Sequence, residues 1–159
     1  MSIIGIVAIA KNLAIGKNGK LPWHYSADLK FFKQTTLNNT IVMGWNTWKE
    51  IGGKPLPKRL NVILSRSKNL ENQPSLILLR NKQEVLALKN YLKGDLFLIG
   101  GAQTFADFSD VIDKWIVTEI PESPADADTF MPANFLEDFE MKEIVSLAED
   151  LNAKIYERK

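Results

Sequence analysis

The sequence predicts an α/β fold: a central, mostly parallel twisted sheet of about eight strands, with an antiparallel C-terminal strand and about four flanking helices. Two patterns indicate this. Short apolar runs rich in β-branched residues alternate with helical patterns as far as residue 120, which is typical of βαβ units. Beyond that point a loop rich in Pro and Asp leads into two late runs that favour an antiparallel finish. The 159 residues suit a single domain, 1–159.

Strands are expected where apolar residues follow one another without an intervening charge. Ile3–Ala10 is the first such run, and its lack of polar alternation predicts a strand buried on both faces. The other expected strands cover residues 40–44, 60–65, 75–79, 95–99, 115–120, 139–145 and 153–157.

Helices are expected between these strands. Residues 27–37 have helical spacing and follow Ser26, which is a favoured N-cap residue. Asn81 and Glu84 form a capping-box pattern that opens a helix running to Gly94. Two shorter helical patterns cover residues 46–51, with Asn46 placed as the cap, and residues 102–108.

The composition excludes several classes of function. Twenty Lys and Arg against nineteen Asp and Glu leave a net charge of +1, whereas proteins that bind nucleic acid through its phosphates usually carry a basic excess. The absence of cysteine excludes disulfides, cysteine-ligated metals and thiol nucleophiles. His24 is the only histidine, which argues against a multi-histidine metal site or a Ser-His-Asp triad. We therefore expect no nucleic-acid partner and no metal.

Nothing in the sequence indicates a membrane segment. No apolar run approaches the roughly 18 residues that a membrane-spanning helix requires. The first residues also lack the basic start and the cleavage signal of a secretory leader. We expect a soluble, cytoplasmic protein.

Three of the expected strands end in residues suited to binding phosphate. The strand ending at residue 99 leads into Gly100 and Gly101, whose missing side chains let a phosphate approach the start of the next helix. The strands ending at residues 44 and 65 lead into a helix start and into a run of Arg, Ser and Lys. Each feature alone is more often a tight turn or a solvated loop. Because the carboxyl ends of parallel strands meet at one edge of a sheet, together they favour a ligand with well-separated phosphates, such as a dinucleotide.

Asp28 borders the apolar stripe that Leu29, Phe32 and Thr36 form on the helix expected over residues 27–37. An acid in the first turn of a helix is favoured by the helix dipole and needs no function. However, the stripe and the preceding Leu-Pro-Trp segment favour burial, which would raise the pKa of the carboxyl. Such an acid is suited to proton transfer or to binding a cationic heterocycle.

Two other features leave their roles open. Arg59 follows a rigid Leu-Pro segment and is either a further exposed cation or a bidentate partner for a carboxylate. The loop after the first expected strand contains Gly16 and an Asn-Gly turn, and loops in that position often carry function. We expect His24, which follows this loop, to lie on the surface.

A known family contains the same segments in the same order. They are Ile15-Gly16, Leu21-Pro22-Trp23, Ala27-Asp28-Leu29-x-x-Phe32, Val42-Met43-Gly44, Thr47-Trp48, Pro55-Leu56-Pro57-x-Arg59, Leu64-Ser65-Arg66 and Ile99-Gly100-Gly101-Ala102-Gln103. No single segment is specific, but the ordered set closely resembles dihydrofolate reductase of bacterial type. The resemblance runs from residue 3 to about residue 132 and returns at the terminal Ile-Tyr-Glu-Arg.

The resemblance implies NADPH-dependent reduction of 7,8-dihydrofolate to 5,6,7,8-tetrahydrofolate, with hydride transfer to C6 and protonation at N5. It implies that Asp28 holds the pterin ring and helps to protonate N5, while Thr118 hydrogen-bonds the Asp28 carboxylate. Arg59 would bind the glutamate α-carboxylate of the substrate. The other substrate-site residues implied are Ile6, Leu29, Phe32, Ile51 and Ile99. Diaminopyrimidine or pteridine antifolates would bind in the same place.

For the cofactor, NADPH, the resemblance implies that the segment from Lys11 to His24 covers the nicotinamide as a lid. Ser65 and Arg66 would bind the phosphate on the adenosine ribose, because Trp45 stands where the family commonly has a basic residue. The other cofactor-site residues implied are Ala8, Ile15, Gly16, Leu21, Trp23, Gly44, Asn46, Thr47, Gly100, Gly101, Ala102, Gln103 and Thr104.

Two other functions stay open. A pyrimidine reductase of riboflavin synthesis has the same fold and also uses NADPH, but the segment from Trp23 to Asp28 and Arg59 favour a pterin with a glutamate tail. A non-catalytic nucleotide-binding module would be favoured if Asp28 were exposed. We expect the protein to act as a monomer.

Overall fold

A computed structural model describes residues 2–17 and 25–159 of the chain. Its strands are β1 (Ile3–Ala10), β2 (Ala14–Gly16), β3 (Thr40–Gly44), β4 (Leu60–Leu64), β5 (Leu76–Leu79), β6 (Leu96–Gly100), β7 (Lys114–Ile120), β8 (Thr129–Phe130), β9 (Phe139–Ala148) and β10 (Leu151–Arg158). Its helices are α1 (Ser26–Thr36), α2 (Trp45–Glu50), α3 (Lys82–Lys89) and α4 (Ala102–Asp107). None of these four helices has the length and apolar character needed to cross a membrane.

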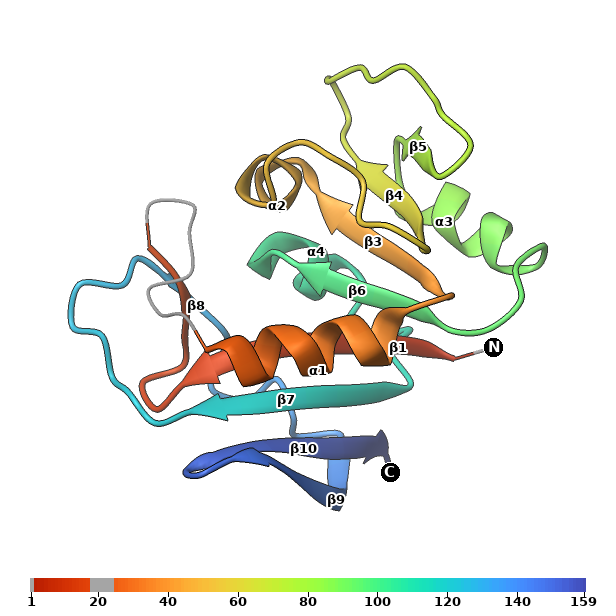
Figure 1. Ribbon diagram of the computed structural model, residues 1–159. Coiled ribbons are helices and arrows are strands. Elements are labelled where there is room, and N and C mark those ends of the chain that lie inside the picture. Colours follow the sequence, from red (N-terminus) through yellow and green to blue (C-terminus); the bar gives the residue numbers. More distant parts are fainter. Residues whose placement is uncertain (1, 18–24) are drawn as a thin grey trace.

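Eight of the strands form one twisted sheet, in the order β5-β4-β3-β6-β1-β7-β10-β9 (Figure 1). The strands from β5 to β7 pair in parallel. Strand β10 pairs antiparallel with both β7 and β9, and the last two strands form a hairpin. The predicted fold, a mostly parallel sheet with an antiparallel C-terminal finish, is confirmed.

Helices cover both faces of this sheet (Figure 1). On one face, Trp48 of α2 and Phe32 of α1 pack against the sheet. On the other face, Val85 of α3 and Phe105 of α4 pack against it. Strand β3 therefore leads into a helix on one face, and its neighbour β6 leads into a helix on the other. A crevice forms outside the carboxyl ends of strands at such a switch point.

Strand β1 lies in the middle of the sheet and is buried on both faces, as its unbroken apolar run predicted. Its side chains alternate between the two cores: Ile4 and Ile6 face one, while Ile3 and Ile9 face the other. Gly5 has no room for a side chain, because a Cβ there would lie 2.6 Å from the ring of Trp115. The central strand therefore depends on both its apolar pattern and one close backbone approach.

Some predicted helix ends were wrong. Tyr25, not Ser26, is the N-cap of α1, and no side chain caps this helix. The cap of α2 is Gly44, so Asn46 lies inside the helix. The Asn81 cap is confirmed, since its side chain accepts a hydrogen bond from the Glu84 N–H at 2.9 Å. The helix was predicted to run to Gly94 but ends at residue 89. A turn follows it and leads to Gly94, which has a left-handed backbone conformation.

A second, two-stranded sheet was not predicted. Strand β2 lies in the loop that follows β1, and it pairs antiparallel with β8. Both strands are too short to show a hydrophobic pattern, and they are far apart in the sequence. Their pairing connects the loop after β1 to the segment that follows β7 (Figure 1).

Candidate active site

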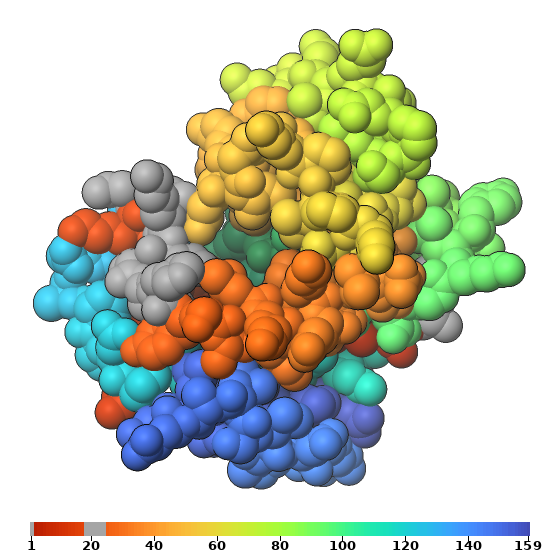
Figure 2. Space-filling model, in the orientation of Figure 1, coloured from red at the N-terminus to blue at the C-terminus, as the bar shows by residue number. Residues whose placement is uncertain are grey.

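A cleft of about 1310 Å³ opens at the carboxyl edge of the parallel strands. Figure 2 shows it as the hollow between α1 (orange) and α2 (gold), with the green β6–α4 segment at its floor. The described residues that the sequence assigned to a substrate or cofactor site all line this cleft, apart from Arg59. Leu21, Trp23 and His24 lie outside the described residues.

Asp28 lies in the first turn of α1, half-buried in the wall of the cleft. Burial raises the pKa of its carboxyl, and a hydrogen bond with the Thr118 side chain partly opposes that rise. Thr118 is itself buried and lies on β7, in register with Ala8 of β1. The two central strands therefore place a hydroxyl beside the acid. The result is a carboxyl that protonates more readily than a free aspartate.

Asp28 differs from the other acids of the cleft in its burial. Glu50, Asp107 and Asp128 also line the cleft, and all three are exposed to solvent. Desolvation disfavours the charged form of a carboxyl, so a buried acid can hold a proton. Among the described acids of this cleft, Asp28 has the environment that proton transfer requires.

Apolar side chains surround Asp28 in the same part of the cleft. Ile6 of β1 is buried, and Phe32, Ile51 and Ile99 are half-buried. Leu29 is the most open of the set, at 47% exposed. An exposed apolar side chain at the edge of an apolar wall is typical of a surface that a ligand covers. This end of the cleft therefore suits a flat, largely apolar ligand.

Arg59 does not line the cleft, and the sequence did not predict how deeply it is buried. Only 6% of it is exposed. Its Nε donates to the carbonyl of Pro57 at 3.0 Å, and its Nη1 donates to the hydroxyl of Thr36, in the last turn of α1, at 3.1 Å. The ion pairs found among residues 2–17 and 25–159 do not include it.

The burial of Arg59 lowers the pKa of its guanidinium, although arginine stays charged at neutral pH. A buried cation that has no acid partner is costly. Two donors are fixed by protein oxygens, and the remaining N–H groups have no protein partner among the described residues. The environment of Arg59 therefore favours an anion.

Glycines form the centre of the other end of the cleft. Gly100 is buried at φ +135°, and a Cβ on it would lie 3.2 Å from the Thr47 hydroxyl oxygen. A Cβ on Gly44 would lie 3.0 Å from the Thr104 hydroxyl oxygen. The end of β3 thus faces α4, and the end of β6 faces α2, with no side chain of either glycine between them. Bare backbone and two hydroxyls at a cleft surface are suited to phosphate oxygens.

The segments after β4 and β5 bring polar and cationic groups to the cleft, among them Ser65, Arg66, Arg80 and Lys82. Arg80 donates to the carbonyls of Ser65 and Lys68 and to the Asn69 side chain, so it is engaged in holding the loop after β4. Lys82 is paired with Asp110. Arg66 is exposed, and no partner for it occurs in the described part of the chain. Of these three cations, Arg66 is therefore the one best able to meet a ligand.

The sequence reasoning missed Arg80 and Lys82 as cleft residues. Arg80 follows β5 directly, so the rule that found the residues after β4 and β6 applies to it as well. Lys68, two residues after Arg66, does not line the cleft. As to metals, residues 2–17 and 25–159 contain no group of three or more His, Cys, Asp or Glu that could hold an ion.

The fold and the cleft define a class of protein. A doubly wound sheet with a glycine-lined crevice at its carboxyl edge, next to one desolvated acid, is the arrangement of α/β oxidoreductases that use a nucleotide cofactor. Known proteins specify the class further. A family model described as dihydrofolate reductase matches residues 2–157.

Individual relatives agree with this match. Dihydrofolate reductase of Haemophilus influenzae is 36% identical over 139 residues, which are 86% of this chain and 82% of that protein. Dihydrofolate reductase of Buchnera aphidicola subsp. Acyrthosiphon pisum is 38% identical over 120 residues, or 76% and 73% of the two chains. The structure of dihydrofolate reductase from Enterococcus faecalis complexed with NADP(H) and RAB-propyl superposes with a TM-score of 0.89 at 30% identity, covering 99% of this chain and 96% of that one.

The chain belongs to the dihydrofolate reductase family, and the resemblance drawn from the sequence is confirmed.

Proposed function

We propose that this chain reduces 7,8-dihydrofolate to 5,6,7,8-tetrahydrofolate with NADPH, by hydride transfer to C6 and protonation at N5. The observation that carries the proposal is the desolvated Asp28 carboxyl, hydrogen-bonded with Thr118 beside an apolar wall. Hydride transfer requires neither a nucleophile nor a metal, but orientation, a proton source and the exclusion of water. One acid of this kind is sufficient for that chemistry.

The substrate end of the cleft suits a pterin with an acidic tail. Asp28 would accept hydrogen bonds from the N3 and 2-amino groups of the pterin and help to place a proton on N5. Ile6, Phe32 and Ile51 would hold the ring system and exclude water. Arg59 would bind the glutamate α-carboxylate through the donors that Pro57 and Thr36 leave available. Diaminopyrimidine and pteridine antifolates would occupy the same pocket.

The opposite end of the cleft fits NADPH. The side-chain-free surface at Gly44 and Gly100, with the hydroxyls of Thr47 and Thr104, suits a pyrophosphate. Ser65 and Arg66 would bind the phosphate on the adenosine ribose. When bound, NADPH supplies the hydride. The solved relative from Enterococcus faecalis, which is complexed with NADP(H), supports the same assignment.

The two alternatives are weaker. A non-catalytic nucleotide-binding module required an exposed Asp28, and this residue is half-buried. A pyrimidine reductase of riboflavin synthesis has no use for a buried cation near a tail carboxylate, and the family match is to dihydrofolate reductase.

The proposed function is tested by following the absorbance of NADPH in the presence of purified protein, with and without dihydrofolate. We expect oxidation that requires dihydrofolate and that a diaminopyrimidine antifolate inhibits. Tetrahydrofolate is identified as the product by chromatography. Binding of NADPH without turnover would favour the nucleotide-binding module. Turnover of a ribosylaminopyrimidine, but not of dihydrofolate, would establish the pyrimidine reductase.

A further inference from the structure

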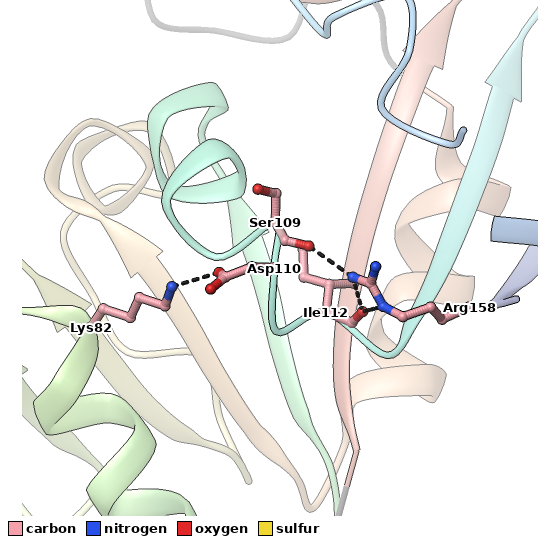
Figure 3. Close-up of polar contacts among 5 residues, drawn as sticks. All are labelled: Lys82, Ser109, Asp110, Ile112 and Arg158. Carbon is pink, nitrogen blue, oxygen red and sulfur yellow. Dashed lines mark hydrogen bonds and ion pairs between the residues drawn. The ribbon is translucent and has the colours of Figure 1, made fainter. Parts of the chain in front are cut away.

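An ion pair joins the start of α3 to the turn that follows α4, next to the phosphate end of the cleft. The Lys82 Nζ lies 2.5 Å from an Asp110 carboxylate oxygen (Figure 3). Lys82 lines the cleft with Arg66 and Arg80, whereas Asp110 does not line it. The lysine side chain is 25% exposed and the aspartate side chain 69%. A cation of the cleft is thus held by an anion outside it.

The anion is held in a fixed position. Arg158 donates to the Ile112 carbonyl from Nε at 3.0 Å and from Nη2 at 2.7 Å, and Nη2 also donates to the Ser109 carbonyl at 2.8 Å (Figure 3). These bonds fix the residues on both sides of Asp110. The Arg158 guanidinium also lies over the ring of Phe139, 4.6 Å from its centroid, which anchors it to β9. The turn that carries Asp110 is therefore clamped to the C-terminal strands.

The cation, by contrast, is on a flexible stem. A lysine side chain has a flexible chain of four carbons and a compact charge, so its ammonium can exchange one anionic partner for another. Arg80, two residues before it, has no such freedom, because its guanidinium is bonded to three oxygens of the loop after β4. Lys82 is thus a second cation of the cleft, beside Arg66, that could reach a phosphate group, provided that it leaves Asp110.

We propose that Lys82 is a specificity residue for the phosphate on the adenosine ribose of NADPH, and that Asp110 limits its contribution by pairing with the Lys82 ammonium from outside the cleft. This inference rests on the proposed function, since it requires NADPH as the cofactor. Binding of NADPH exchanges the Lys82–Asp110 ion pair for a Lys82–phosphate ion pair. The affinity for NADPH therefore gains only the difference between the free energies of the two ion pairs. NADH lacks this phosphate and leaves the ion pair intact.

Substitution of Lys82 and substitution of Asp110 should change the affinity for NADPH in opposite directions. This distinguishes the proposed role from a structural one. Asp110→Asn frees Lys82 and should tighten NADPH binding about two- to fivefold, the range expected for a partly exposed ion pair. Lys82→Met should weaken it by a similar factor. The double variant should equal Lys82→Met, because Asp110 then has no cation to restrain. The affinity for NADH should stay within the error of measurement in all three variants.

Asp107→Asn is the matched control, since Asp107 is also an exposed acid but, unlike Asp110, lines the cleft from α4. Asp107→Asn changes NADPH binding only through the overall electrostatic potential of the cleft. Its effect should therefore be the same in the wild-type protein and in the Lys82→Met variant. The effect of Asp110→Asn should disappear in the Lys82→Met background.

The experiment is titration of the whole protein with NADPH and NADH by nicotinamide fluorescence, with thermal unfolding of each variant measured in parallel. Weaker NADPH binding by both single variants would show that the ion pair has a structural role and would overturn the inference. Equal changes in the affinities for NADPH and NADH would overturn it as well. Unchanged NADPH binding in both variants would also overturn it, while leaving the proposed function intact. A wild-type protein that does not bind NADPH would overturn both.

Discussion

The side chains of Thr118, on β7, and Asp28, on α1, are hydrogen-bonded across the end of the parallel sheet. This bond and the burial of the acid act in opposite directions. Burial disfavours the carboxylate and raises the pKa of Asp28, whereas a hydroxyl that donates to the carboxylate lowers it. Burial is the larger effect, so the pKa lies above that of a free aspartate. The pH dependence of the reaction should report this balance.

Thr118→Val should move the pH profile to higher pH. In the proposed mechanism the protonated state of the site is the productive one, so kcat/KM should fall as pH rises. Valine keeps the shape of threonine but donates no hydrogen bond, which leaves burial unopposed and raises the pKa of Asp28 further. Measurement of kcat/KM against pH checks this. Thr40→Val, at a buried threonine on β3, is the control and should leave the profile in place. A shift to lower pH would contradict the role of Thr118.

Asp28→Asn should retain the fold and NADPH binding but lose most dihydrofolate reduction at pH 7. General acid catalysis contributes about a hundred- to ten-thousand-fold, and the amide cannot supply it. The loss should become smaller at low pH, where the substrate arrives already protonated. Steady-state rates between pH 5 and pH 8 check both statements. Rates close to those of the wild-type protein at pH 7 would exclude Asp28 from the mechanism.

The same substitution should stabilise the protein at neutral pH. Because the pKa of Asp28 is higher in the folded state, the folded protein binds more protons than the unfolded chain between the two pKa values. Stability is therefore lost as pH rises above about 3.9, the ordinary pKa of aspartate. Asparagine removes this penalty. Thermal unfolding should show a higher Tm for Asp28→Asn at pH 7, and the difference should vanish near pH 3. A lower Tm at pH 7 would indicate that the carboxylate stabilises the fold.

The fold was predictable because its signals are local. An apolar run such as Ile3–Ala10 specifies a buried strand, and its alternation with helical patterns specifies a parallel sheet. Helix caps were less predictable, since any Ser or Asn near a helix start can act as one. Ser26 and Asn46 both lie one position or more inside the helix, and only the backbone geometry decides this.

The candidate site was predictable where it follows strand ends, as at Gly100 and Arg66. It was not predictable where a contact joins distant segments. The depth of Arg59 depends on Thr36 at the end of α1, and the restraint on Lys82 depends on a turn near residue 110. Neither sequence pattern nor charge count indicates such pairs, because they arise from the packing of separate elements.

Arg59→Ala should weaken the binding of folate-type ligands while leaving small diaminopyrimidine inhibitors nearly unaffected. These inhibitors have no glutamate, so they cannot use the guanidinium. A charged hydrogen bond of this kind contributes about 1.5–3 kcal/mol, or roughly a ten- to a hundred-fold change in affinity. Dissociation constants for the two ligand types check the prediction.

Thr36→Val is the control for Arg59, because it removes the bond to Nη1 and keeps the charge. We expect it to weaken folate-type ligands less than Arg59→Ala does, since the Pro57 carbonyl still holds the guanidinium. Equal losses for folates and for diaminopyrimidines in Arg59→Ala would assign Arg59 a structural role instead.

Arg66→Ala should bring the KM for NADPH close to the KM for NADH. The two cofactors differ by one phosphate on the adenosine ribose, and reading it requires a cation. Trp45 and Gln103, at two other positions of the cleft, bring no charge, and Arg80 is engaged by the loop after β4. Arg66 has no partner in the described part of the chain, which leaves its guanidinium available.

The loss expected for Arg66→Ala is about 1.5–3 kcal/mol, or roughly ten- to a hundred-fold in the KM for NADPH. The kcat should change little, because the nicotinamide lies at the other end of the cofactor. Since Arg66 is exposed, the preference of the wild-type protein for NADPH should also shrink as salt is added. Lys68→Ala removes the same charge from the same loop at a residue that does not line the cleft, and it should leave the preference nearly unchanged. If Arg66→Ala retains the wild-type ratio of the two KM values, Arg66 is a loop cation and another residue reads the phosphate.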